Sequence, residues 1–128
     1  MRFASTAFAL AACVMCLPAH AAGIPDEPFA RDMITCAFKH VTFAFGPGDA
    51  AVAENAASEA RAYLDAAAEA SSQGFVETES EVLKPQAQEA VFAAMGEAKD
   101  VSGIVGAWKA TKATCDGQLA SFRAAQQR

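Results

Sequence analysis

Apolar residues recur along most of the chain at the three- and four-residue spacing of an α-helix, with no competing alternation of the kind typical of strands. These patterns predict four helices, over residues 26–45, 49–72, 78–98 and 102–125. The connections between them are short. We therefore expect an all-α fold, a four-helix bundle of up-down-up-down topology in which the first and last helices are neighbours.

The helix predicted over 26–45 organises the rest of the chain. Asp26 can cap its start, with Pro28 in the first turn, and the Gly-Pro-Gly run at 46–48 can end it. A surface this apolar must be covered from two sides, as in a bundle. On a helical wheel Thr42 lies on the polar arc. The face that we expect to be buried comprises Phe29, Met33, Cys36, Ala37, His40, Phe43 and Ala44, and it is widened on one side by Ile34, Phe38, Val41 and Phe45.

The two central helices are less sharply defined. The segment 49–72 is rich in alanine, has Asp49 as a possible cap, and is expected to end at Gly74. For 78–98, Thr78 and the glutamate three residues later fit a capping box. Pro85 falls inside this element, so we expect one helix that bends near residues 84–85.

The last helix, over 102–125, carries the clearest apolar stripe and places Cys115 in its middle, as Cys36 lies in the middle of the first helix. Both cysteines should therefore face inward on helices that can pack together. The stripe comprises Ile104, Trp108, Thr111, Cys115, Leu119 and Phe122.

The N-terminus reads as a secretory signal peptide over residues 1–21, which leaves a single helical domain over 22–128. A basic start precedes an uncharged apolar run, and small residues stand before the expected cleavage point at Ala22. An alternative is a lipoprotein signal, because Leu-Ala-Ala precedes Cys13. The apolar run continues past that cysteine, which favours the ordinary signal.

Cleavage would remove Cys13 and Cys16 and leave Cys36 and Cys115 in an oxidising compartment. The sequence therefore predicts a disulfide between Cys36 and Cys115 that joins the first and last helices. The alternatives are free thiols or a metal site, but a thiolate metal site normally uses a close pair of cysteines, which the chain lacks.

Charge and motifs argue against several function classes. The formal net charge is −5, with no basic patch, which disfavours nucleic acid as a partner. The longest apolar run is too short for a stable membrane span. No phosphate loop, nucleophile elbow or zinc-protease motif occurs, so we do not expect an enzyme, although carboxylate pairs brought together only in three dimensions are left open.

His40 is the one polar residue within the predicted apolar face, and the only histidine outside 1–21. The simpler interpretation is a partly buried histidine bonded to a backbone carbonyl. The alternative is a cofactor-binding bundle, in which His40 and a methionine, Met33 or Met95, would hold a haem non-covalently. We expect neither cofactor nor metal as the leading interpretation.

We therefore expect a small exported, non-enzymatic helical protein, periplasmic or secreted, that binds a protein partner as an inhibitor, immunity protein or chaperone. In plan it is similar to periplasmic acid-stress chaperones and to some periplasmic immunity proteins, a likeness of architecture that no motif carries. Trp108 and Tyr63 are expected in the core; exposed, either would be a candidate partner contact.

Overall fold

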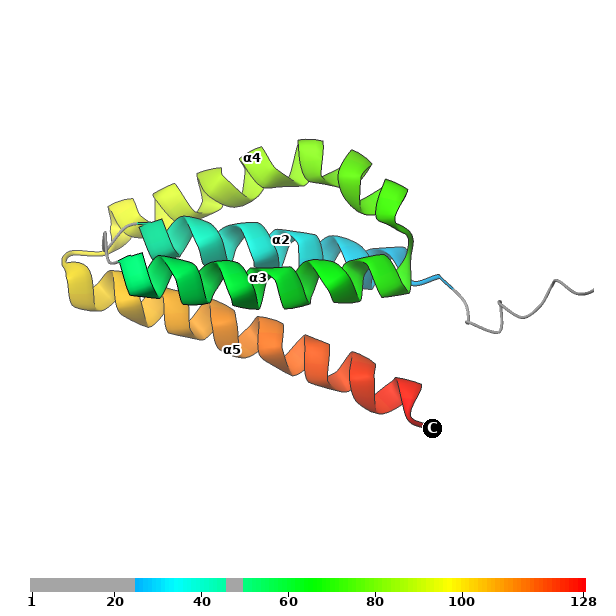
Figure 1. Ribbon diagram of the computed structural model, residues 1–128. Coiled ribbons are helices and arrows are strands. Elements are labelled where there is room, and N and C mark those ends of the chain that lie inside the picture. Colours follow the sequence, from blue (N-terminus) through cyan, green and yellow to red (C-terminus); the bar gives the residue numbers. More distant parts are fainter. Residues whose placement is uncertain (1–24, 46–49) are drawn as a thin grey trace, which may run out of the picture.

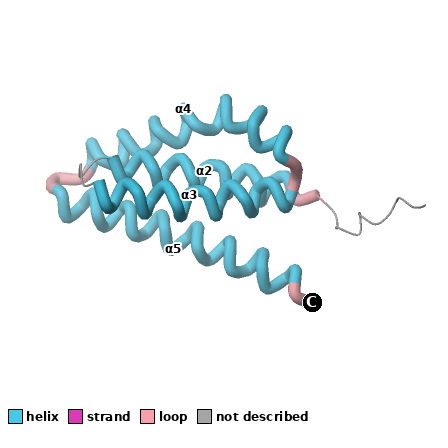
Figure 2. Tube along the Cα trace, in the orientation of Figure 1, coloured by secondary structure: helices cyan, strands magenta, loops and turns pink. Residues whose placement is uncertain are grey.

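The computed structural model describes residues 25–45 and 50–128, and over these residues it is all-helical (Figure 1). The predicted signal peptide over 1–21, including Cys13, lies outside the described residues, as do the expected turn at 46–48 and the expected cap Asp49. Figure 2 shows short loops between α3 and α4 and between α4 and α5. The helices are α2 (Glu27–Phe45), α3 (Ala50–Ala70), α4 (Gln73–Glu97) and α5 (Val101–Gln126).

α2 is the central helix, because it packs against α3, α4 and α5 while those three helices touch one another little. Its buried face differs from the predicted one most clearly at two positions. Phe45, which was expected to widen the apolar face, is 71% exposed. Thr42 is only 8% exposed, although it was expected on the polar arc, and its hydroxyl donates to the carbonyl of Phe38 at 2.6 Å. The buried residues of α2 are Ala30, Met33, Ile34, Cys36, Ala37, His40, Thr42, Phe43 and Ala44.

α3 packs closely along α2 because its inner face consists mostly of methyl groups, with Tyr63 as the one large buried side chain. The ends of the two helices are tied together by the backbone: the N–H of Asp26 donates to the carbonyl of Ala70 at 2.7 Å. The carboxylate of Asp26 also accepts from the N–H of Phe29 at 3.1 Å, so the predicted cap is confirmed. The buried residues of α3 are Ala56, Ala60, Tyr63, Ala66, Ala67 and Ala70.

α4 begins five residues earlier than predicted, and the capping box at Thr78 is wrong. Ser72 caps the helix instead, because its hydroxyl accepts from the N–H of Phe75 at 3.0 Å. Gly74 therefore lies in the first turn of α4 rather than at the end of α3. The expectation of one element through Pro85 is confirmed, and α4 bows away from α2 in Figure 1. A proline in a helix interior removes one backbone hydrogen bond and favours such bending.

α5 is held less firmly than its apolar stripe predicted. Cys115 is its only buried residue, and the other members of the stripe are half-buried. The predicted disulfide is present: Cys36 and Cys115 join α2 to α5 with their Cα atoms 5.9 Å apart. Towards the end of α5, Phe122 stacks on Phe29 with ring centroids 4.2 Å apart. Within the described residues, none of the helices combines the length and hydropathy needed to span a bilayer.

Candidate functional site

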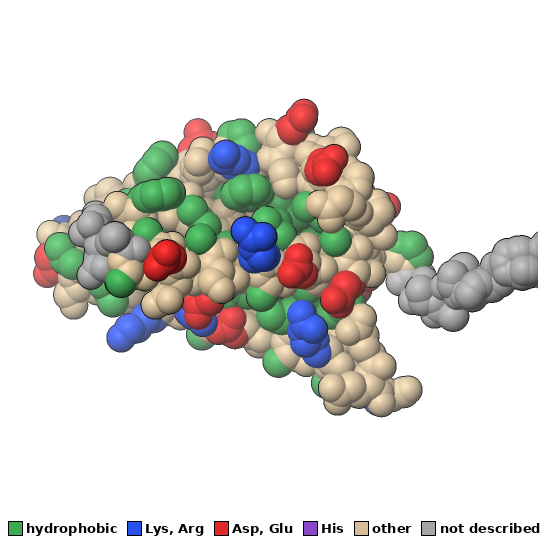
Figure 3. Space-filling model, in the orientation of Figure 1, with side chains coloured by type: hydrophobic (Ala, Val, Ile, Leu, Met, Phe, Trp, Pro, Cys, Tyr) green, Lys and Arg blue, Asp and Glu red, His purple; other side chains and the backbone are tan. Residues whose placement is uncertain are grey.

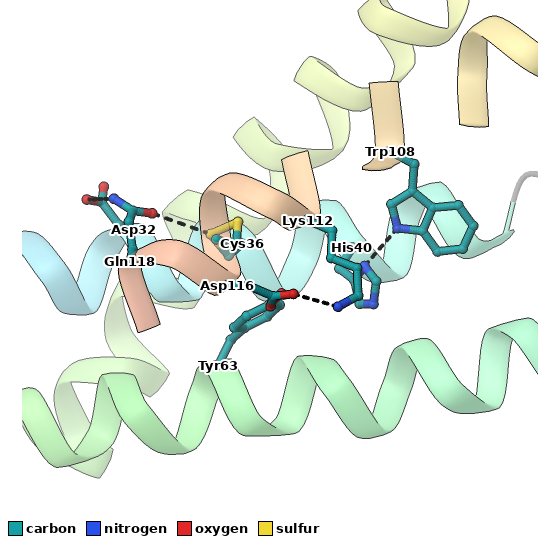
Figure 4. Close-up of a disulfide and its surroundings, with 9 residues drawn as sticks. Asp32, Cys36, His40, Tyr63, Trp108, Lys112, Asp116 and Gln118 are labelled. Atoms are coloured by element: carbon teal, nitrogen blue, oxygen red, sulfur yellow. Dashed lines mark hydrogen bonds and ion pairs between the residues drawn. A yellow bond between two sulfur atoms is a disulfide. The ribbon is translucent and has the colours of Figure 1, made fainter. Parts of the chain in front are cut away.

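His40 lies at the centre of a polar cluster that joins α2, α3 and α5 beside the disulfide (Figure 4). His40 is only 3% exposed. Its Nδ1 accepts from the indole N–H of Trp108 at 2.7 Å, and its Nε2 lies 2.7 Å from a carboxylate oxygen of Glu59. The ring is therefore bonded to two side chains rather than to the backbone carbonyl that the sequence suggested.

These two partners determine the tautomer of His40. An indole N–H can only donate, so Nδ1 of His40 must carry the lone pair. The proton of the neutral ring then sits on Nε2 and is donated to Glu59. Protonation at Nδ1 would place two N–H groups against each other and break the hydrogen bond to Trp108. The contact between α2 and α5 at this point thus depends on a neutral imidazole.

The cluster continues from Glu59 to Tyr63 through two residues of α5. Lys112 lies 3.4 Å from Glu59 and donates to Asp116 at 2.7 Å, and the hydroxyl of Tyr63 donates to Asp116 at 2.6 Å. Burial, together with the bond to Asp116, raises the pKa of the Tyr63 phenol. Desolvation alone would raise the pKa of Asp116, but the hydrogen bonds from Lys112 and Tyr63 outweigh it and lower that pKa. Asp116 in turn raises the pKa of Lys112.

The arrangement of this cluster ties three helices together. Across the described residues, no buried side-chain nitrogen or oxygen lacks a hydrogen-bond partner. The two buried members of the cluster, His40 and Tyr63, find their partners within it, whereas Glu59 and Asp116 are 46% and 50% exposed. A further bond from the side chain of Gln118 to Asp32, 3.1 Å long, ties α5 to α2 on the other side of the disulfide.

A cavity of about 270 Å³ reaches the His40 ring between α3 and α5, with Trp108 and Lys112 in its wall. The methionines proposed as haem ligands are elsewhere. Met33 is fully buried in the core, and Met95 lines a separate groove on the other side of α3. The structure does not bring His40 together with Met95, and both ring nitrogens of His40 are engaged. The residues present therefore do not fit the haem hypothesis.

A groove of about 730 Å³ lies between α3 and α4, with α2 as its floor. It exists because α4 bows outward while α3 stays close to α2. Figure 3 shows apolar side chains gathered on this face, interspersed with charged ones. Apolar residues that line the groove include Phe38, Val41, Leu64, Val76, Phe92 and Met95.

The groove also holds large apolar side chains that remain in water. Phe92 is 61% exposed and Phe45 is 71% exposed. The bow of α4 is what leaves Phe92 uncovered. Three charged residues line the groove: Arg61 and Asp65 on α3 and Lys84 on α4. Neither Arg61 nor Lys84 makes an ion pair with another described residue, and the ammonium of Lys84 lies 5.8 Å from the centre of the Phe38 ring.

Sequence reasoning placed Cys36 and Cys115 correctly but missed the cluster partners and the groove. The spacing of Lys112 and Asp116, four residues apart on one helix, was the only local signal for the cluster. Nothing in the helical pattern signalled the groove, because Phe92 fits a core face as well as an exposed one.

Within the described residues, no group of three or more histidine, cysteine, aspartate or glutamate side chains could hold a metal ion.

Comparisons with known proteins do not alter this picture. The chain matches no protein-family model, and neither a curated protein nor a solved structure resembles it significantly.

Proposed function

We propose that this chain is an exported, non-enzymatic binding protein whose groove between α3 and α4 receives apolar side chains of a protein partner. The observation that carries the proposal is the exposure of Phe92 and Phe45 at a concave apolar surface. Leaving such side chains in water is costly, at about 25 cal/mol per Å² of apolar area. Contiguous exposed apolar surface of this kind is typical of interaction sites.

A protein partner suits this groove because part of its wall on α4 is exposed and because charged residues line it. Pockets for small ligands usually enclose most of the ligand surface. Here Phe92 and Lys84 stand on an exposed wall, which is the arrangement expected where a partner completes the enclosure. An aromatic anchor at the centre of a contact and a polar margin are common in protein interfaces.

Export, into the periplasm or the medium, is supported by the disulfide between Cys36 and Cys115, because such bonds persist in oxidising compartments. The apolar run within residues 1–21 agrees with that route. Intact-mass measurement of protein recovered from outside the cytoplasm should give a chain that starts at Ala22. A chain that retains residues 1–21, or that carries lipid on Cys13, would contradict this part of the proposal.

We also propose that the helices alternate in direction as an up-down-up-down bundle. Contacts between α2 and α5 support it, because Phe29 meets Phe122 whereas His40, further along α2, meets Trp108, earlier in α5. The bond from Asp26 to Ala70 similarly joins the start of α2 to the end of α3. Spin labels placed at the start of α2 and the end of α5 should then give short distances, and long ones would refute this arrangement.

The binding proposal is tested by capture with the full mature chain as bait. Wild-type protein, Phe92→Ala and Val101→Ala are immobilised and exposed to a native extract of the producing cells. Val101 is the matched control, because it is 69% exposed and does not line the groove. We expect the wild type and Val101→Ala to retain the same protein, and Phe92→Ala to lose at least about 80% of it, corresponding to roughly 1–2 kcal/mol for an anchor side chain.

Two results would overturn the binding proposal. One is that no protein is retained by the wild type above a blank matrix. The other is that Phe92→Ala retains the captured protein as well as Val101→Ala does, because the groove would then not be the contact.

A further inference from the structure

We infer that the groove takes an amphipathic α-helix whose apolar stripe is flanked on both sides by acidic residues. This inference rests on the proposed function and names the chemistry of the partner segment. It follows from three properties of the groove: its length, the character of its walls and the sign of its charges.

The length and walls of the groove favour a helix. The apolar residues of its wall on α4 extend from Val76 to Met95, which corresponds to about 28 Å at the rise of an α-helix. A helix of about 19 residues would lie along it and contact α2, α3 and α4 together. An extended peptide would need backbone partners, and the described part of the chain offers no strand edge to supply them. A helix satisfies its own backbone, so it can enter an apolar groove without that cost.

The charges of the groove favour acidic flanks. Arg61 on α3 and Lys84 on α4 stand on opposite walls, and Asp65 is the one acidic residue among the lining residues. The groove is therefore locally positive in a chain whose formal net charge is −5. Arg61 and Lys84 have no ion-pair partner among the described residues, so carboxylates of an incoming helix would not have to displace any. One cation on each wall calls for one acidic flank on each side of the apolar stripe.

The test uses two synthetic helical peptides of about 19 residues with the same leucine-rich stripe. One has glutamate on both flanks, and the other has lysine. Binding to the mature chain is followed by the anisotropy of a dye on the peptide. Two exposed charge pairs of about 0.2–1 kcal/mol each predict that the acidic peptide binds about two- to thirtyfold more tightly than the basic one. High salt should reduce this preference, because these charges are exposed.

Charge-reversal variants locate the effect. Arg61→Glu combined with Lys84→Glu should abolish or invert the preference. Lys109→Glu combined with Arg123→Glu changes the net charge by the same amount on α5, outside the groove, and should preserve it. Phe92→Ala should weaken both peptides alike, because it removes an apolar contact and no charge.

The outcomes separate this inference from the proposed function. Equal affinity for both peptides would refute the inference that the bound helix has acidic flanks. A preference for the acidic peptide that survives Arg61→Glu with Lys84→Glu would refute it as well. If neither peptide binds while a native partner is still captured through Phe92, the inference that the groove takes a helix is refuted. The proposed function is then unaffected. Binding of dodecanoate without binding of either peptide would overturn the helix in favour of a small amphiphile.

Discussion

Removal of the disulfide should destabilise this protein more than any other small change, because α5 has so little else to hold it. Cys115 is the only buried residue of α5, and the cluster around His40 supplies its main polar contacts with α2 and α3. We consider the double variant Cys36→Ala with Cys115→Ala. The bond closes a loop with a sequence separation of 79 residues.

The magnitude follows from the entropy of that loop. On the chain-entropy relation, a cross-link over this separation stabilises the folded state by about 4.5 kcal/mol at 25 °C. Domains of this size are stable by roughly 5–15 kcal/mol in total. The double variant should therefore lose about 30% or more of its free energy of unfolding, and α5 should separate before the pair α2 and α3 does.

The assay is urea denaturation at pH 7, followed by two signals. Far-ultraviolet circular dichroism reports all four described helices, whereas the fluorescence of Trp108, the single tryptophan of the chain, reports the contact of α5 with α2. We expect the two transitions to coincide in the oxidised wild type and to separate in the variant, with the fluorescence changing first. Wild type reduced with a dithiol is the control, because it loses the bond without losing side-chain volume.

A loss below about 1 kcal/mol in both the variant and the reduced wild type would refute this reasoning. It would mean that the half-buried stripe of α5 holds the helix in place without the covalent link. A large loss in the variant together with a small one in the reduced protein would assign the effect to the cavities left by alanine, and would equally contradict the loop argument.

Further predictions concern the cluster and one helix cap. Because the pKa of Tyr63 is raised, its neutral phenol stabilises the fold below the ordinary phenol pKa of about 10, and this stabilisation is lost as the pH rises above that value. In an alkaline titration, absorbance at about 295 nm should therefore show tyrosinate only as the chain unfolds. Because the pKa of Asp116 is lowered, its carboxylate stabilises the fold above the ordinary carboxyl pKa of about 4, and this stabilisation is lost in acid. Asp116→Asn should therefore lower the free energy of unfolding by about 0.5–1 kcal/mol at pH 7 and leave it unchanged below the folded-state pKa. An equal loss at both pH values would refute this reasoning. Ser72→Ala should lower the free energy of unfolding by about 1 kcal/mol in urea titrations, and no change would mean that the cap contributes nothing.

The fold class and the disulfide could be predicted because both depend on local pattern. Apolar spacing of three and four residues marks a helix wherever it is placed in space, and it put Cys36 and Cys115 in the middle of two apolar faces. With two cysteines in the predicted mature chain, only one pairing is possible. The structure confirms that pairing, and it confirms one helix through Pro85.

Helix ends depend on competition between several possible caps, which the pattern alone does not decide. Thr78 fitted a capping box, yet Ser72 caps α4, because a helix that starts earlier gains further backbone bonds and buries Val76. The misplaced boundary also misassigned Gly74. Boundaries of this kind are decided by which start lets the following turns pack against α2.

The sequence by itself determined which stretches are helical, which face of each is apolar, and which two sulfurs join. Only the tertiary structure decided that α2 is enclosed by three helices, that α4 bows away to leave Phe92 exposed, and that His40 bonds to Glu59 and Trp108, residues 19 and 68 positions away. The reason is that helical periodicity reports one element at a time. The distance between two elements is decided by the sizes of side chains from both, and hydrogen bonds across that distance leave no periodic trace in either.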